Sequence, residues 1–446
     1  MPSPQPPSVL RSPRLWIGTG LILAVIAALF SLLYVGGNVN PKGNLRDLPV
    51  ALVNSDAGAE VKGKPLNLGD QVVSGIKKSA ESNHSFSWQV MSRQEADKKL
   101  GQGKVFGALV VPRNFTAAVA GLSAPQQTKA VRPALTVLTN QSAGSIGSSM
   151  ASQATQKAAH AASAQLGKEL VGRAESQGAK LAPAAQLMLA DPVTVQVEDG
   201  HPLGTHSAMG LSAFYYALVL VVCGMLGANA ITSQVDTALG YLHTDFGPFR
   251  QRMPLRPTSR VRTLAVGSVL MLGLSVLMGS LVEGATVGIL GMDASHLGLL
   301  WLYSVGTIAV VGVSALALLA AFGTPGMLIS TIVFVAMAVP SSGATVPLQA
   351  LPDFFRTLSE FEPLRQITGG TRAILYYDAQ ADAGLSRAWI SMGIAFAASV
   401  LFGFGVTRFY DRKGLHRHPR PEEAAEGTGA DEAAGSADAA PAPATA

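Results

Sequence analysis

The stretch "LPVALVNSDAG" at Leu48–Gly58 is a short apolar run that ends abruptly in residues that favour turns. Runs of about 4 to 8 aliphatic and β-branched residues between turn formers are typical of buried strands. Asn54–Asp56 is expected to form the turn, because Asn and Asp side chains bond to nearby backbone; ligand binding is the alternative. "FGALVVPRNF" at Phe106–Phe115 and "PALTVLTNQS" at Pro133–Ser142 repeat the pattern. The sequence therefore predicts a domain that contains a sheet.

Helical periodicity occupies the gaps between these predicted strands. Leu68–Ser79 and Arg93–Leu100 show it, and further strands are expected at Phe86–Met91 and Val193–Gly200. Strands that alternate with helices favour a small mixed or parallel sheet covered by helices. We therefore expect an α/β domain.

Residues 145–176 are rich in Ala, Ser and Gln and are predicted to form one long helix. Small or apolar residues recur in it every four positions: Ile146, Met150, Ala154, Ala158, Ala162, Leu166, Leu170 and Ala174. Small side chains allow another element to approach the helix closely. The stripe favours packing on the sheet, and pairing with a second copy or a partner is the alternative.

The composition indicates a membrane protein. Of 446 residues, 48% are hydrophobic and only 14% are charged, against about 25% charged in soluble domains. A spanning helix needs about 20 apolar residues. The predicted spans are Leu15–Val35, Ala208–Ile231, Thr263–Leu281, Leu297–Phe322, Met327–Val346 and Ala388–Thr407. The fold class is thus a polytopic α-helical membrane protein, with an α/β domain between the first and second spans and the lipid bilayer as its first partner.

Arginines in short loops predict the orientation, because Lys and Arg accumulate on the cytoplasmic side. They precede the first span, lie between the second and third, and follow the sixth: Arg11, Arg14, Arg250, Arg252, Arg256, Arg260, Arg262, Arg408, Arg412, Arg417 and Arg420. With six spans both termini are cytoplasmic.

This orientation predicts the following segments: a cytoplasmic N-terminus at 1–14, the first span at 15–37, an extracytoplasmic α/β domain at 38–207, a five-span domain at 208–410 with a cytoplasmic basic loop at 232–262 and an external re-entrant segment at 341–387, and a disordered cytoplasmic tail at 411–446.

Motifs of catalysis are missing from the sequence. It has no Gly-x-x-x-x-Gly-Lys-Ser/Thr loop, no His-Glu-x-x-His pair and no Gly-x-Ser-x-Gly elbow. Cys223, the single cysteine, lies in a predicted span, so no internal disulfide is expected. We expect no enzyme, cofactor, metal site or nucleic-acid partner; an ATPase would be a separate subunit.

Two features of the predicted spans suggest transport. Glu283 is an acid in the apolar stretch 263–290. A carboxylate at mid-bilayer costs about 2.5 to 3.5 kcal/mol, so Glu283 is expected at the outer interface, with proton coupling as the alternative. In the fifth predicted span, Pro340-Ser-Ser-Gly343 interrupts the apolar run after only about 20 Å of helix, which is too short to cross the bilayer. Non-helical backbone at this depth can line a translocation path. The alternative is that the helix ends at Pro340. Candidates for lining a path are Tyr215, Tyr216, Pro340 and Gly343.

One span, an external domain and five further spans resemble the permease subunits of type-2 ABC exporters. "LPVALVNSDAGAEVKGKPLNLGDQVV" and "VFGALVVPRNFTAAVAG" are similar to the YhgE/Pip (phage infection protein) and nitrosoguanidine-resistance families within that superfamily. "VPLQALPDFFRTLSEFEPLRQITGGTRAILYYD" matches a stretch in which prolines, two short re-entrant helices and an arginine precede the last span. Positions that match these motifs are Asn54, Asp56, Pro112, Asn140, Pro352, Pro363 and Arg372.

The resemblance implies the membrane subunit of a bacterial inner-membrane exporter of hydrophobic or amphipathic compounds, acting as a homodimer with a separate cytoplasmic ATPase. Arg250, Arg252 and Arg256 would face that partner. The sequence departs from the superfamily in two places: it lacks an amphipathic helix before the first span and the usual coupling sequence after the second. The alternatives are an envelope receptor or scaffold that acts through the external domain, and proton-coupled efflux through Glu283.

Overall fold

The computed structural model describes residues 13–61, 64–80, 84–122, 132–176, 186, 189–242, 244–246, 249–251, 253–415 and 417. The chain divides into two compact units. The first unit comprises Met1–Val222, Met278–Ile308 and Thr331–Gly393, and the second comprises Cys223–Leu277, Ala309–Ser330 and Ile394–Ala446.

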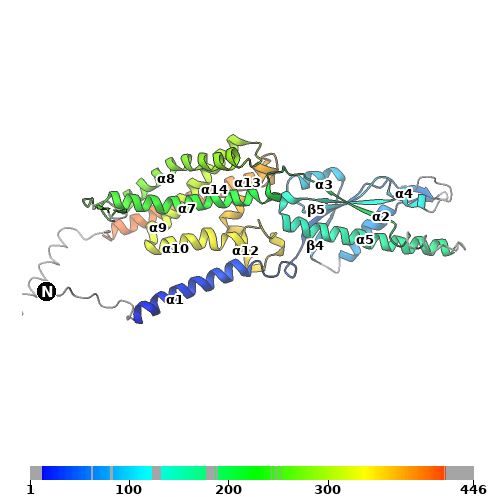
Figure 1. Ribbon diagram of the computed structural model, residues 1–446, viewed down its shortest axis with the longest axis horizontal. Helices are drawn as coiled ribbons and strands as arrows, with labels where there is room; N and C mark the ends of the chain where they lie inside the picture. The colour runs from blue at the N-terminus through cyan, green and yellow to red at the C-terminus, as the bar shows by residue number, and fades with distance from the viewer. Residues whose placement is uncertain are drawn as a thin grey trace, which may run out of the picture. The chain divides into compact units, whose positions relative to one another are not determined.

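The first unit contains a mixed sheet of five strands in the order β4-β1-β5-β6-β7 (Figure 1). The strands are β1 (Leu48–Asn54), β4 (Phe86–Val90), β5 (Gly107–Val111), β6 (Ala134–Thr139) and β7 (Thr194–Asp199). β1 runs parallel to β4 and β5, whereas β6 runs antiparallel to β5 and parallel to β7. This confirms the strand predicted from "LPVALVN" and places it inside the sheet, where its apolar residues are buried on both faces.

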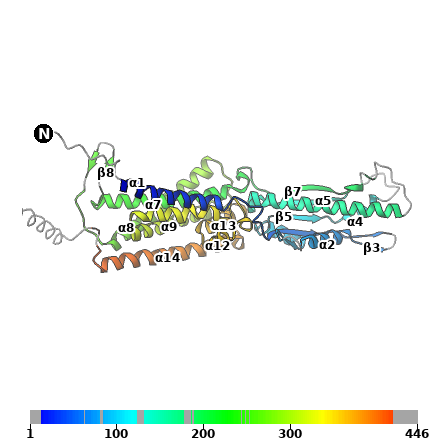
Figure 2. The same ribbon diagram turned by 90° about the horizontal axis from the view of Figure 1, so that it is seen from below.

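Helices cover both faces of the sheet because successive strand residues point to opposite sides. Leu52 packs with α2, α4 and α5 on one face, and its neighbour Val53 packs with α3 on the other (Figures 1 and 2). The helices are α2 (Leu68–Ala80), α3 (Arg93–Leu100), α4 (Phe115–Leu122) and α5 (Ser145–Ser176). A small antiparallel pair, β2 (Ala59–Val61) and β3 (Lys64–Leu66), precedes α2.

The long helix α5 is present as predicted, but the stripe of residues that it buries is different. Ile146 is 40% exposed, whereas Ala151, Thr155, Ala159 and Ser163 are completely buried. Thr155 donates to the carbonyl oxygen of Ala151, and Ser163 donates to Asp191. Satisfied hydroxyls can therefore face the sheet, and a count of apolar residues misses them. The buried face supports packing on the sheet.

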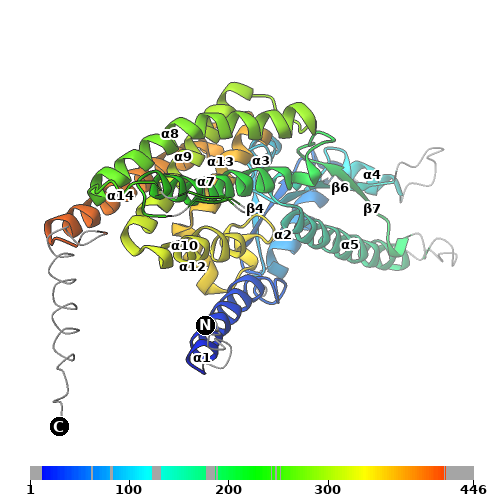
Figure 3. The ribbon, with the colours of Figure 1, turned by 60° about the vertical axis from the view of Figure 1, so that its left-hand side comes forward.

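The described residues contain six helices that are long and apolar enough to cross a membrane. They are Trp16–Val35, Ser212–Ala238, Arg260–Ile289, Leu297–Phe322, Thr324–Ser341 and Leu385–Arg412. Their elements are α1 (Pro13–Phe30) with η2 (Ser31–Val35), α7 (Ser212–Ala238), α8 (Arg260–Glu283) with η5 (Gly284–Ile289), α9 (Leu297–Phe322), α10 (Thr324–Thr331) with η6 (Ile332–Ala336) and α11 (Ala338–Ser341), and α14 (Leu385–Arg412). The first span is the helix labelled α1 in Figure 3. None of its spanning window is buried.

Several predicted boundaries of these spans differ from the ends of the helices. α7 continues to Ala238, so the loop predicted at 232–262 begins later and contains the small hairpin of β8 (Thr244–Phe246) and β9 (Phe249–Gln251). The third span continues to Ile289. The fifth ends at Ser341 instead of Val346, because Gly343 takes a left-handed backbone conformation with φ +67°.

Two short helices, α12 (Asp353–Phe361) and α13 (Pro363–Tyr376), lie between the fifth and sixth spans. Pro352 precedes α12, and Pro363 is the first residue of α13, where its missing N–H costs nothing. The pair of helices implied by the family resemblance is therefore present. The tail predicted at 411–446 lies outside the described residues except for 411–415 and 417.

Candidate functional site

A cavity of about 340 Å³ lies within the second unit, between α7, α8 and α9. Its wall is mostly aliphatic, with two threonines and two arginines among the lining residues: Thr232, Val235, Arg260, Thr263, Leu264, Gly267, Leu316, Leu319, Ala320, Gly323 and Arg417. Cavities of this size with a few convergent polar groups are the usual form of small-molecule sites.

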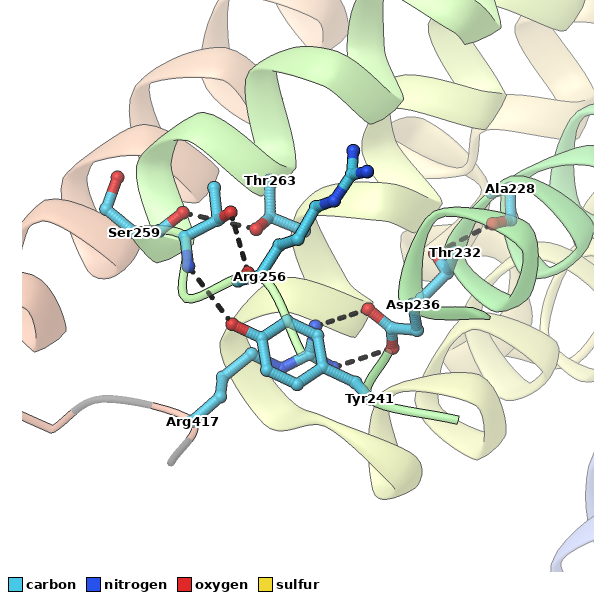
Figure 4. Close-up of polar contacts among 9 residues, drawn as sticks. Ala228, Thr232, Asp236, Tyr241, Arg256, Ser259, Thr263 and Arg417 are labelled. Atoms are coloured by element: carbon cyan, nitrogen blue, oxygen red, sulfur yellow. Dashed lines mark hydrogen bonds and ion pairs between the residues drawn. The ribbon is translucent and has the colours of Figure 1, made fainter. Parts of the chain in front are cut away.

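Asp236 and Arg417 form a bidentate ion pair beside this cavity (Figure 4). Nη2 of Arg417 donates to Oδ2 of Asp236 at 2.7 Å, and Nη1 donates to Oδ1. Asp236 is only 6% exposed. Its bond to Arg417 raises the pKa of that guanidinium, since the bonded form must be charged. The positive charge of Arg417 is thus neutralised by Asp236, which lies in the last turn of α7.

Tyr241 holds the chain around this pair. Its ring centre lies 5.0 Å from Cζ of Arg417, and its hydroxyl accepts from the backbone N–H of Thr258 at 3.2 Å. The backbone N–H of Tyr241 donates to the carbonyl oxygen of Asp236 at 2.8 Å. Tyr241 therefore links the end of α7, at Asp236, to Thr258 near the start of α8.

Arg260, the first residue of α8, is held differently. Its Nε donates to the carbonyl oxygen of Leu415 at 2.9 Å, and its Cζ lies 5.2 Å from the ring centre of Tyr410. Asp411 accepts the backbone N–H groups of Arg260 and Val261, at 3.0 and 3.1 Å, and so caps the helix. Among the described residues the side chain of Arg260 forms no ion pair. The cavity therefore has an apolar wall, one neutralised arginine and one whose charge has no carboxylate partner.

The sequence prediction missed this site. It placed the end of the second span at Ile231, because Thr232, Gln234 and Asp236 interrupt the apolar run. Those polar residues continue the helix instead, and Asp236 finds its partner in Arg417, 181 positions away. Ile231 and Val235, four positions apart, could have indicated that the helix continues to Asp236, because apolar residues at this spacing share one face of a helix. The sequence did not show which of the distant arginines would pair with Asp236.

The four residues predicted to line a path do not share one surface. Tyr216 is 2% exposed and exchanges a 2.7 Å hydrogen bond with Ser304, while its neighbour Tyr215 is 56% exposed. Pro340 is buried, and a methyl group added at Gly37 would come within 3.0 Å of it. Gly343 packs against Leu348. The proposed path stays a prediction.

The three arginines predicted to meet a cytoplasmic partner are only partly described. Arg250 lies in β9, opposite Asp245 of β8, and Arg252 falls outside the described residues. Arg256 is exposed, and its guanidinium points away from Asp236 and Arg417 (Figure 4). Nothing in the structure tests their role.

Glu283 lies further from a helix end than predicted, since the third span continues to Ile289. Its Oε2 is buried and has no hydrogen-bond partner in the described part of the chain.

The remaining motif positions have structural duties in the sheet domain. Asn54 accepts the backbone N–H of Asp56 at 3.0 Å, the bond to nearby backbone that the sequence predicted. The carboxylate of Asp56 accepts backbone N–H groups of Gly69 in α2 and of Thr116 in α4, both at 3.1 Å. Asn140 is completely buried and donates to the carbonyl oxygens of Leu100 and Val105, at 2.9 and 2.8 Å.

Two of the prolines and an arginine complete the set of motif positions. Pro112 ends β5, and its carbonyl oxygen accepts the N–H of Phe115 at the start of α4. Pro363 opens α13, which carries Arg372 near its end. Arg372 donates from Nη2 to the carbonyl oxygen of Ala344 at 3.1 Å.

Six apolar helices, an α/β sheet domain and an arginine-bearing cavity together define a multi-pass membrane protein with a separate α/β region. A family model described as "Protein of unknown function (DUF3533)" matches residues 19–395, and the chain belongs to this family.

A shorter stretch is similar to a curated protein, the uncharacterized protein YhgE of Bacillus subtilis (strain 168). The two are 31% identical over 102 residues, which is 22% of this chain and 13% of YhgE. The chain thus matches only a small part of that relative's length. No solved structure matches the chain.

Proposed function

We propose that this protein is the membrane subunit of an exporter of amphipathic anions, compounds with a hydrophobic body and an acidic head. The observation that carries the proposal is the cavity lined by aliphatic side chains such as Leu264 and Leu316 together with Arg260. Aliphatic walls take up a hydrocarbon body, and a guanidinium prefers a carboxylate or phosphate head. Arg417 offers less to a ligand, because Asp236 already neutralises it.

The proposed orientation follows from the arginines near the spans. The cavity is lined by the ends of α7 and α8 that adjoin the arginine-rich loop, so it would open toward the cytoplasm of a bacterial cell. The sheet domain would then lie outside the plasma membrane, and both termini inside. An exporter that takes its cargo from the inner side of the bilayer needs a site in this place.

Ligand binding to the full-length protein tests the cavity. A fluorescent long-chain fatty acid and the matching fluorescent alcohol differ only in the acidic head. We expect Arg260→Gln to weaken binding of the acid about tenfold, since hydrogen bonds to charged groups contribute about 1.5 to 3 kcal/mol. Binding of the alcohol should hardly change. Arg256→Gln is the matched control, because that guanidinium is exposed and lies away from the ion pair. Equal affinity of the wild type for acid and alcohol would refute the proposal.

The energy source and assembly are tested in native membranes. We infer a homodimer and a separate ATPase from the resemblance to type-2 exporter permeases. Mild-detergent purification through a C-terminal tag, followed by protein identification, mass measurement and an ATPase assay, should recover a nucleotide-binding partner. A folded dimer without one would remove the ATP-driven form of the proposal and leave the binding site intact.

Proton-coupled efflux is a second candidate, and the unpartnered Oε2 of Glu283 favours it. A carboxyl held in an apolar span without a partner is suited to carry a proton. In proteoliposomes, Glu283→Gln should abolish export driven by a pH gradient and leave ATP-driven export unchanged. Unchanged pH-driven export would exclude this candidate.

A further inference from the structure

Three arginines lie in the helix pair α12 and α13. Two of them have an acidic group nearby that balances their charge, and the third does not. Arg356 forms an ion pair with Asp353 at 3.6 Å. Nη1 of Arg365 donates two hydrogen bonds of 3.0 Å to Ser359, one to its carbonyl oxygen and one to its hydroxyl. The carboxylate of Glu360 is close enough to stabilise the charge of Arg365. Among the described residues, Arg372 has one hydrogen bond, to the carbonyl oxygen of Ala344.

The charge of Arg372 has no carboxylate partner in the described part of the chain. Its Nε is sealed from solvent and has no hydrogen-bond partner, although the residue as a whole is only half-buried. Burial lowers the pKa of Arg372, and the groups that act in the opposite direction are the hydroxyls of Tyr377 and Tyr376. Since an arginine stays charged in a protein, an enclosed guanidinium of this kind is costly unless an anion balances it.

Tyr377 supplies a second donor, a hydroxyl, next to Arg372. The residue is 3% exposed, and the side chain of Ser142, two residues before Gly144, lies within hydrogen-bonding reach of that hydroxyl. Burial raises the pKa of Tyr377 to about 12, so the hydroxyl keeps its proton and can donate it. Gly103 faces this hydroxyl with φ +64°, and a side chain there would collide with it.

The beginning of α5 adjoins the same guanidinium. A methyl group added at Gly144, the residue before α5, would lie 3.6 Å from Nη2 of Arg372. The first turn of α5 contains no acidic residue. A helix N-terminus carries a partial positive charge and repels a guanidinium, so two positive groups meet here. An anion between them would relieve both.

We propose that Arg372, the Tyr377 hydroxyl and the start of α5 bind a small inorganic anion. The ion would be one of a few atoms, such as chloride or phosphate, and the partial exposure of Arg372 gives it access. Because the site joins α13 to the sheet domain within the first unit, the anion would stabilise that junction. The proposal is independent of the cavity in the second unit.

Thermal unfolding of the full-length protein in detergent tests the site. The buffer is exchanged to gluconate, and chloride or phosphate is then titrated at constant ionic strength. We expect one of the two anions to raise the unfolding temperature of the wild type by a few degrees with saturation. Arg372→Gln should abolish the rise, whereas Arg365→Gln should keep it. The anion that acts identifies the ligand as a halide or an oxyanion.

Tyr377→Phe keeps the test decisive if Arg372→Gln does not fold. This variant removes the hydroxyl and keeps the ring. The anion should raise its unfolding temperature less than it raises that of the wild type. A wild type that responds to neither anion, or an Arg372→Gln variant that responds as the wild type does, would overturn the proposal.

Discussion

The sheet domain and the spanning helices expose different kinds of side chain. In the sheet domain the interior is aliphatic, with Leu52, Leu109 and Leu135 completely buried. In the helices hydroxyl pairs lie inside, such as Ser314 with Ser399 at 2.6 Å, whereas Leu401 is 75% exposed. Water sorts side chains by hydrophobicity, but lipid is as apolar as leucine and does not. A large apolar side chain can therefore face outward from a spanning helix, whereas in the sheet domain most large apolar side chains are buried.

The largest expected effect tests the sheet side of this comparison. Leu109→Ala removes a completely buried side chain from the core and should lower the free energy of unfolding by about 2 to 5 kcal/mol. Leu277→Ala is the matched control, since this leucine of α8 is 56% exposed. Thermal or denaturant unfolding of the full-length protein measures both. An equal loss from the two variants would contradict the comparison.

Glu362 between α12 and α13 should make stability depend on pH. It is 3% exposed, and burial raises its pKa from 4.5 to about 8. Between these values the unfolded chain has released a proton that the folded protein keeps, so stability falls as pH rises from about 4.5 to about 8. Glu362→Gln should flatten the profile, and Glu360→Gln, at an exposed position, should not. A profile unchanged by Glu362→Gln would contradict the buried carboxyl.

The Asp236–Arg417 pair tests the value of a charge pair in the second unit. Asp236→Asn should lower the free energy of unfolding by about 1 to 2 kcal/mol, a value reduced because the Arg417 side chain is 30% exposed. Combining Asp236→Asn with Arg417→Gln gives a double-mutant cycle. If the pair is direct, the double variant should lose less than the sum of the two single losses; strict additivity would argue against the pair.

The smallest effect is expected at Tyr216. Tyr216→Phe removes a buried hydrogen bond to Ser304, and such bonds between spanning helices average about 0.6 kcal/mol. Tyr215→Phe, at an exposed position, should have no effect on unfolding. If Tyr216→Phe lowered transport but not stability, the tyrosine would line the path that the sequence suggested.

Local patterns were sufficient to predict much of the fold. The apolar run at Leu48–Asn54 is a strand, Arg93–Leu100 is a helix with the predicted ends, and residues 145–176 form one helix. These elements depend on periodicity and on turn residues that lie within a few positions of each other. The end of α7 was missed because Asp236 is polar in a helix whose partner residue is far away in the sequence.

The sequence by itself determined that this is a multi-pass membrane protein with an α/β domain, because hydrophobic length and strand alternation are local properties. Only the tertiary structure decided which charges are balanced. It joined Asp236 to Arg417, left Arg260 at an apolar cavity, and placed Arg372 beside Tyr377, where none of the described residues gives it an acidic partner. The balance of a charge depends on what the fold brings near it, and no pattern along the chain records that distance.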